Sequence, residues 1–370
     1  MALAIYRKYR PSTFEDLLGQ EIVVQILKEA ARQEKIAHAY LFAGPRGTGK
    51  TTTARLIAKI ANCETRAKDE KFRATGEPCN KCQKCEEIDA GRSLDVIEID
   101  AASNRGIDEI RDLKENVKTA PIGSKHKVFI IDEAHQLTKD AFNALLKTLE
   151  EPPSYVIIIL ATTEAEKLPA TITSRTQQFY FKHIPLHQIT GKIRKIATEE
   201  KIDLTEEAAD LISSSAEGSF RDAESVLDQL ISFGHQKITI DEVEKMLGKV
   251  GFDKLSALAG SLIDGNAKNA LEIVSQIEDG GYNLAQLTKD LIRYLRRVAV
   301  LKFNPGMKNL FERELMADHL NKIIAHGQIF KDGDLNLIKR LIAAYSQMRY
   351  SQFPIIPLEV AIIESEKKPS

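Results

Sequence analysis

The chain has 370 residues, of which 43% are hydrophobic and 28% are charged, which is an ordinary balance for a globular protein. Its length predicts two or three domains. With 52 basic and 53 acidic residues, the chain lacks the overall positive charge that marks many nucleic-acid-binding proteins. No run of 18 apolar residues occurs and the first residues make a poor signal peptide, so we expect a cytoplasmic protein without a membrane span.

Short apolar runs alternate with amphipathic helical stretches through the first half of the chain. Four runs rich in β-branched residues predict buried parallel strands, at residues 39–43, 96–99, 128–131 and 156–160. Helices are expected between them, for example over residues 51–61 and 140–149. This alternation predicts an α/β fold with a doubly wound parallel sheet and helices on both faces.

The first predicted strand leads into a sequence that fits G-x-x-x-x-G-K-[ST] at every fixed position. Glycines let backbone N–H groups turn toward phosphates, Lys50 can reach the β and γ phosphates, and the Thr51 hydroxyl can bind Mg²⁺. A helix that follows directs its N-terminal dipole at the same phosphates. We expect ATP to bind here through Gly44, Pro45, Arg46, Gly47, Thr48, Gly49, Lys50, Thr51 and Thr52.

All four cysteines of the chain fall shortly after this motif. Three of them are separated by two residues each, and the fourth lies 16 positions before the first of these. Four thiolates favour a closed tetrahedral Zn²⁺ site without an open position for catalysis. An iron–sulfur cluster is the alternative, and free structural cysteines are a weaker one. The expected zinc ligands are Cys63, Cys79, Cys82 and Cys85.

Two acids follow the third predicted strand directly. Asp132 is placed to hold Mg²⁺ together with Thr51, and Glu133 is placed to act as general base on the attacking water. The run Asp132-Glu133-Ala134-His135 also occurs in a family of helicases. The sequence downstream is too short and too helical for the second RecA-like domain that such helicases need. A scaffold that binds nucleotide without hydrolysing it would need no Glu133.

Beyond about residue 183 the apolar positions recur with helical spacing. Helices are expected over residues 205–216, 219–233 and 239–246, and the last has Thr239 as N-cap and Glu242 at the third position. A second helical block begins near residue 251. Its expected helices are 254–263, 267–277, 284–301, 310–326, 334–350 and 357–365. The last four residues, 367–370, are expected to be disordered.

Several further segments resemble the gamma/tau family of bacterial DNA polymerase III clamp-loader subunits, which belongs to the AAA+ superfamily. The segments that carry the resemblance are residues 10–20, 38–42, 145–153, 160–163, 173–176 and 218–223. Together with a P-loop and a Cys₄ module after its helix, they are similar to that family. Two features depart from it: Thr176 replaces a cysteine in its Ser-Arg-Cys motif, and the insert 64–78 is longer than expected.

The resemblance implies an ATPase domain with a zinc module at 1–182, a three-helix lid at 183–247 and a helical collar at 248–366. It also implies that the chain opens a sliding clamp and loads it onto primer–template DNA, in a hetero-pentamer with further copies of itself and with delta and delta-prime type subunits. An AAA+ helicase or branch-migration motor is the alternative.

The resemblance further implies residue roles. It implies that Thr163 contacts the γ-phosphate or the attacking water, that Arg221 reports nucleotide state within the subunit, and that Arg175 acts in trans as an arginine finger. It places Tyr6, Arg7 and Leu18 near the adenine.

Overall fold

The computed structural model describes residues 4–103, 113, 115–234, 237–312, 315–348 and 350–366. The chain forms two compact units. The first comprises the chain up to Ile184 together with Gly218–Asp222, and the second comprises Pro185–Glu217 and the chain from Ala223 onward. The predicted tail at 367–370 lies outside the described residues. No helix in the described part of the chain is long and apolar enough to cross a membrane.

A five-stranded parallel sheet forms the centre of the first unit. Its strands are β1 (Ala39–Ala43), β2 (Val96–Asp100), β3 (Lys127–Asp132), β4 (Val156–Thr162) and β5 (Gln177–Tyr180). The order across the sheet is β2-β3-β4-β1-β5, and all neighbours run parallel. This confirms the predicted α/β fold. The expectation that all four predicted strands are buried was wrong for β2, because β2 is an edge strand whose residues are only half-buried or exposed.

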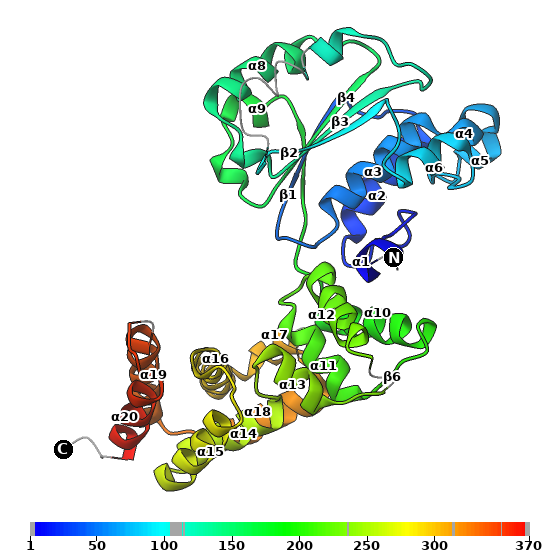
Figure 1. The fold of residues 1–370 in the computed structure, drawn as a ribbon. Helices are drawn as coiled ribbons and strands as arrows, with labels where there is room; N and C mark the ends of the chain where they lie inside the picture. Colours follow the sequence, from blue (N-terminus) through cyan, green and yellow to red (C-terminus); the bar gives the residue numbers. More distant parts are fainter. Residues whose placement is uncertain are drawn as a thin grey trace. The chain divides into compact units, whose positions relative to one another are not determined.

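Helices cover both faces of the sheet (Figure 1). On one face α2 (Glu21–Arg32) and α3 (Lys50–Asn62) pack against alternate strand residues such as Phe42 and Ile130. On the other face α8 (Lys139–Glu150) and α9 (Ala170–Thr173) pack against the strand residues between them, such as Phe129. Further helical segments in the described part of this unit include α1 (Ile5–Lys8), α4 (Glu64–Lys68), α5 (Glu70–Arg73), α6 (Gln83–Asp89), η1 (Ala134–Gln136) and η2 (Ala165–Lys167).

The second unit begins with helices and one two-stranded pairing. Thr205 accepts a 3.3 Å hydrogen bond from the N–H of Ala208 as N-cap, and the N–H of Thr239 donates to the Glu242 carboxylate at 2.8 Å, which confirms the predicted capping box. The strands β6 (Asp203–Leu204) and β7 (Lys237–Ile238) pair in parallel. The helices here are α10 (Leu186–Glu199), α11 (Glu206–Ser215), α12 (Phe220–Ser232) and α13 (Ile240–Leu247).

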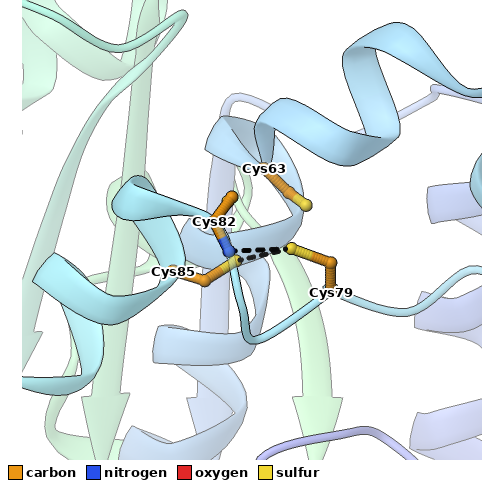
Figure 2. Close-up of side chains that lie close together, drawn as sticks. All are labelled: Cys63, Cys79, Cys82 and Cys85. Atoms are coloured by element: carbon orange, nitrogen blue, oxygen red, sulfur yellow. Dashed lines mark hydrogen bonds between the residues drawn. The ribbon is translucent and has the colours of Figure 1, made fainter.

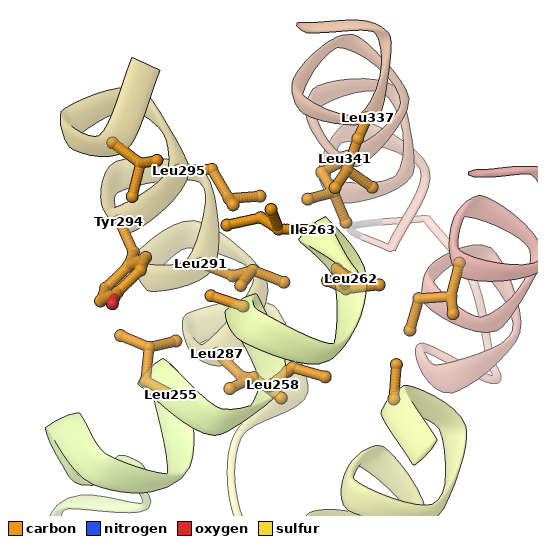
Figure 3. Close-up of a cluster of buried hydrophobic side chains, with 14 of the residues drawn as sticks. Leu255, Leu258, Leu262, Ile263, Leu287, Leu291, Tyr294, Leu295, Leu337 and Leu341 are labelled. Carbon is orange, nitrogen blue, oxygen red and sulfur yellow. The ribbon is translucent and has the colours of Figure 1, made fainter. Parts of the chain in front are cut away.

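The rest of the second unit is helical around one apolar core (Figure 3). One apolar face of α16 (Leu284–Phe303), the helix expected over residues 284–301, is buried in this core, with Leu291 and Leu295 fully enclosed. A single helix over 310–326 was a wrong prediction: α17 ends at Phe311, which is buried, and α18 begins at Ala317. The helices are α14 (Phe252–Ile263), α15 (Ala267–Asp279), α16 (Leu284–Phe303), η3 (Pro305–Met307), α17 (Lys308–Phe311), α18 (Ala317–Ile329), η4 (Asp332–Asp334), α19 (Leu335–Met348) and α20 (Ile355–Glu366).

Candidate functional site

The glycine-rich loop joins β1 to α3, and its glycines are required by geometry. Gly44, Gly47 and Gly49 all have positive φ, at 146°, 72° and 103°. A Cβ on Gly47 would lie 1.9 Å from the Ser219 hydroxyl oxygen, so the loop has no room for a side chain there. The result is a compact turn whose next residues, from Lys50 on, begin a helix, as a phosphate-binding loop requires.

Lys50 is almost fully buried, at 6% exposure, and its ammonium is held over the loop. It donates 2.8 Å hydrogen bonds to the carbonyls of Gly44 and Pro45. Burial lowers the pKa of Lys50, and the nearby charges of Glu133 and Asp132 oppose that change. The cation is therefore positioned where phosphate oxygens would lie.

The predicted magnesium ligands meet across two elements. The Thr51 hydroxyl, on the first turn of α3, donates a 2.7 Å hydrogen bond to Asp132 at the end of β3. Their two oxygens are the hard ligands that Mg²⁺ prefers. The residues thus fit the ion that the motif predicts.

Glu133 and Thr163 extend this arrangement from the ends of β3 and β4. Glu133 has a left-handed backbone, with φ 48°, and its N–H donates to the Asp132 carboxylate at 3.0 Å. The Thr163 hydroxyl donates to the Glu133 carboxylate at 3.2 Å. Because β1, β3 and β4 run parallel, their carboxyl ends bring these side chains to the same edge as the glycine-rich loop.

His135 is a member of the site that we did not predict. Its side chain is 5% exposed, and Nδ1 lies 3.0 Å from the Thr162 hydroxyl and 3.5 Å from the Glu133 carboxylate. Its Nε2 lies 3.3 Å from the Glu164 carboxylate. The imidazole therefore links the loops after β3 and β4. Its position two residues after the general-base candidate was the available signal.

The segment around Arg221 reaches the glycine-rich loop. The N–H of Phe220 donates to the Gly47 carbonyl at 3.2 Å. The Arg221 guanidinium lies 5.2 Å from the centroid of the Tyr6 ring, and that of Arg7 lies 5.8 Å from it. Two predicted adenine-side residues and the predicted nucleotide sensor are thus neighbours.

Leu18 and its neighbour Leu17 differ in their surroundings. Leu18 is 40% exposed, whereas Leu17 is buried and a Cβ on Gly49 would lie 3.2 Å from its side chain. Leu17 therefore packs on the loop, and Leu18 presents its side chain to the outside of the described chain.

Arg175 stands apart from these groups. Within the described residues its hydrogen-bond and ionic partners are Glu150, at 2.7 Å, the Thr171 carbonyl, at 2.9 Å, and the Ser174 hydroxyl. None of these belongs to the nucleotide site of its own chain. The Arg175 side chain is 36% exposed and so is available to another molecule.

The four cysteines converge, as Figure 2 shows. Their sulfur atoms all lie within 4.8 Å of one another. Cys63 directly follows α3, Cys79 lies on the loop between α5 and α6, and Cys82 and Cys85 lie at the start of α6. N–H groups of Lys81 and Cys82 donate to the Cys79 sulfur at 3.4 and 3.3 Å. A hydrogen bond with Cys85 lowers the pKa of Cys63 to about 4, and the same interaction raises the pKa of Cys85. This is a compact thiol set suited to a tetrahedral metal ion.

Three family models match the chain in succession. Residues 19–185 match "DNA polymerase III, delta subunit", 188–236 match "DNA polymerase III clamp loader subunit, ATPase lid domain", and 238–365 match "DNA polymerase III subunits gamma and tau domain III". The matches cover most of both units.

Curated relatives agree with these matches. The chain is 43% identical over 361 residues to DNA polymerase III subunit tau of Bacillus subtilis, covering 98% of this chain and 62% of that protein. It is 42% identical over 300 residues to the tau subunit of Escherichia coli, covering 81% and 46%. It is 38% identical over 303 residues to the gamma subunit of Buchnera aphidicola subsp. Schizaphis graminum, covering 82% of each. The chain thus spans less than two thirds of the two tau subunits and most of the gamma subunit, and it belongs to the gamma/tau family of DNA polymerase III subunits.

Proposed function

We propose that this chain is an ATPase motor subunit of a clamp loader, which uses ATP to open a sliding clamp and load it onto primer–template DNA. The observation that carries the proposal is the set formed by Thr51, Asp132, Glu133 and Thr163 beside Lys50, which provides candidate magnesium ligands, a general-base candidate and a phosphate-binding cation at one edge of the sheet. Family membership supports the clamp-loading part of the proposal, because residues 188–236 match a family model described as a clamp loader subunit's ATPase lid domain. A cytoplasmic location belongs to this proposal.

Each residue of the set has a chemical task. Lys50 exchanges its two carbonyl partners for the β and γ phosphates. Mg²⁺, held by Thr51 and Asp132, would offset charge on the phosphates. Glu133 accepts a proton from the attacking water, and Thr163, which donates a hydrogen bond to Glu133, contacts the γ-phosphate or the attacking water.

In this proposal two arginines contact the phosphates of ATP, one within the subunit and one across to a neighbouring subunit. Arg221 contacts the phosphates of its own subunit from the segment that packs on Gly47, with Tyr6, Arg7 and Leu18 on the adenine side. Arg175 reaches the ATP of a neighbouring subunit, since its partners in its own chain lie outside the nucleotide site. A guanidinium suits this role because it stays charged and binds phosphate through two N–H groups.

The assembly is a hetero-pentamer of further copies of this chain with delta and delta-prime type subunits. We assign residues 1–182 to the ATPase domain, 183–247 to the lid and 248–366 to the collar that joins subunits. The lid and collar limits fall close to the matched ranges 188–236 and 238–365.

We also propose that Cys63, Cys79, Cys82 and Cys85 hold one structural Zn²⁺. Four sulfurs within 4.8 Å of one another leave no ligand position for a substrate. The cluster contains no Cys-Pro pair of the kind that bacterial ferredoxin motifs carry, which favours zinc over an iron–sulfur cluster.

The test is steady-state ATP hydrolysis by the wild type and Arg175→Ala, each alone and with delta-type subunits, sliding clamp and primed DNA. We expect little turnover alone, a large stimulation by clamp with primed DNA, and loss of that stimulation in Arg175→Ala. Full activity in the isolated chain, stimulated by any DNA and indifferent to the clamp, would instead support a helicase-type motor.

A mixing experiment separates action in trans from a local role of Arg175. We expect Lys50→Ala and Arg175→Ala each to be inactive in an assembly that contains one variant alone. In mixed assemblies, the intact Lys50 of one copy meets the intact Arg175 of another, so we expect part of the activity to return. No return at any mixing ratio would contradict an arginine finger.

A further inference from the structure

Arg66 is a cation buried beside the four-cysteine cluster. Its residue exposure is 5%, and it lies on α4, three positions after Cys63. Its guanidinium donates to the carbonyls of Ala31, at 2.8 Å, and Arg73, at 3.1 Å, with a longer 3.4 Å bond to that of Glu77. All three acceptors are neutral, so these hydrogen bonds do not balance the charge.

No carboxylate in the described part of the chain forms an ion pair with this guanidinium. The carboxylates of Glu34 and Glu77 influence Arg66 electrostatically, but Glu34 is paired with Arg73 at 3.1 Å. Glu77 is held by Lys28, at 3.0 Å, and by the N–H of Phe14, at 2.8 Å. A buried cation is costly unless an opposite charge lies nearby. Arg66 therefore needs a source of negative charge that these acids do not supply.

A second buried cation near the cluster shows the contrast. Lys59 on α3 has a side chain that is 1% exposed, and its ammonium lies 2.7 Å from the Asp89 carboxylate and 2.8 Å from the Asn80 side-chain oxygen. The charge of Lys59 is thus balanced by a carboxylate. Arg66, in contrast, has no carboxylate partner of this kind among the described residues.

The cysteine cluster can supply the missing charge. Four thiolates around one divalent ion carry a net charge of about −2. Cys63 is the N-cap residue of the helix that carries Arg66, and the Glu77 carbonyl that the guanidinium holds lies two residues before Cys79, so the guanidinium lies between the segments of two cluster cysteines. The guanidinium in turn holds the Ala31 carbonyl at the end of α2, so the same side chain joins the cluster to the body of the domain.

We propose that Arg66 is the counter-cation of the metal centre and a positioning residue that couples metal loading to the docking of α4 on α2. This inference rests on the proposed zinc site. Loading the metal deprotonates all four thiols and so increases the negative charge beside the buried guanidinium, and losing the metal decreases it. Metal affinity and the stability of this docking then depend on each other.

The test compares Arg66→Met, Arg66→Lys and the control Lys68→Met in the full chain. Lys68 lies on the same helix and is exposed, so its replacement removes the same charge from the surface. Zinc affinity is measured by competition with a chromophoric chelator. We expect Arg66→Met to bind zinc about 10- to 100-fold more weakly, as changes around metal ligands do, and Lys68→Met to match the wild type.

Arg66→Lys separates charge from hydrogen bonding. Lysine keeps the charge but cannot hold all the carbonyls, so we expect near wild-type zinc affinity even if the thermal midpoint falls. The rise in midpoint on adding zinc should shrink in Arg66→Met only. If Arg66→Met lowered the thermal midpoint equally with and without zinc and left zinc affinity unchanged, Arg66 would have only a structural role.

Cobalt distinguishes failure of this inference from failure of the zinc site. Wild type loaded with Co²⁺ should show the absorption of a tetrahedral thiolate site. If it does not, the proposed zinc site is wrong. If it does, and Arg66→Met and Arg66→Lys bind zinc as tightly as wild type, the counter-cation role is overturned while the zinc site stands.

Discussion

The hydroxyl of Thr51 donates a 2.7 Å hydrogen bond to the carboxylate of Asp132, although the two residues are 81 positions apart in the chain. The contact joins the first turn of α3 to the end of β3. It exists because both lie at the carboxyl edge of one parallel sheet. Two oxygens that face each other at this distance need little rearrangement to share a metal ion.

Asp132 and Glu133 should separate binding from chemistry. We expect Asp132→Asn to lose the Mg²⁺-dependent part of ATP affinity, because an amide is a weaker metal ligand. We expect Glu133→Gln to keep ATP affinity and to lose about 10²- to 10⁴-fold in turnover, because the general base is removed. Fluorescent-nucleotide titration with and without Mg²⁺, beside single-turnover hydrolysis, measures both. Equal defects in the two variants would contradict this division of roles.

Gly47→Ala should weaken nucleotide binding and the packing of the Arg221 segment on the loop. A methyl group there meets the Ser219 oxygen at 1.9 Å, and φ is 72°. Gly91→Ala is the matched control, since its φ is 65° but nothing lies within 4 Å of the added atom. We expect the control to lose about 1 kcal/mol of stability from backbone strain alone. Gly47→Ala should lose more, and thermal melts with and without ATP test this.

Asp210 should make stability depend on pH. One of its carboxylate oxygens is buried without a hydrogen-bond partner in the described chain. Arg194 lies 3.8 Å away, and Glu206 and Glu207 add negative charge nearby. Burial raises the pKa of Asp210 to about 6 from an ordinary 3.8. The folded chain therefore holds this proton more tightly than the unfolded chain, and its contribution to stability falls as pH rises from about 4 to 6.

Asp210→Asn removes this dependence. We expect a higher thermal midpoint than wild type at pH 7 and little difference at pH 4. Asp203→Asn, whose side chain is 68% exposed, serves as control and should change neither value. A variant that is less stable than wild type at pH 7 would show that attraction to Arg194 outweighs the cost of burial.

Zinc removal should weaken the nucleotide site at a distance. Cys63 caps the C-terminal end of α3, whose N-terminal end forms the phosphate site. We expect a zinc chelator or Cys82→Ser to lower the thermal midpoint by several degrees and also to weaken ATP binding. Calorimetry and nucleotide titration measure the two effects. Unchanged ATP affinity in a zinc-free, folded chain would show that the two ends of α3 are independent.

Contiguous motifs made much of the fold and the site predictable. The glycine-rich loop, the acid pair after β3 and the cysteine spacing each depend on residues close together in the sequence, and the structure places each on the expected kind of element. Long apolar runs likewise predicted β1, β3 and β4, because strands buried on both faces need no polar positions.

Features that depend on tertiary contacts were not predictable in the same way. β5 was missed because its first two residues, Gln177 and Gln178, are exposed and polar at the sheet edge. The break between α17 and α18 was missed because helical spacing continues through it. His135 was missed because its partners, Thr162 and Glu164, come from a different strand end. The roles assigned to Thr163, Arg175 and Arg221 remain predictions.

The ammonium of Lys50 has consequences for the energetics of ligand entry. It already lies out of water and rests on two loop carbonyls, so a phosphate that arrives replaces weak neutral acceptors and does not strip water from a hydrated charge. Folding, not binding, has dehydrated this cation. The cost of that dehydration thus lowers the free energy of unfolding of the empty domain. Binding of an anion in the loop should raise the free energy of unfolding.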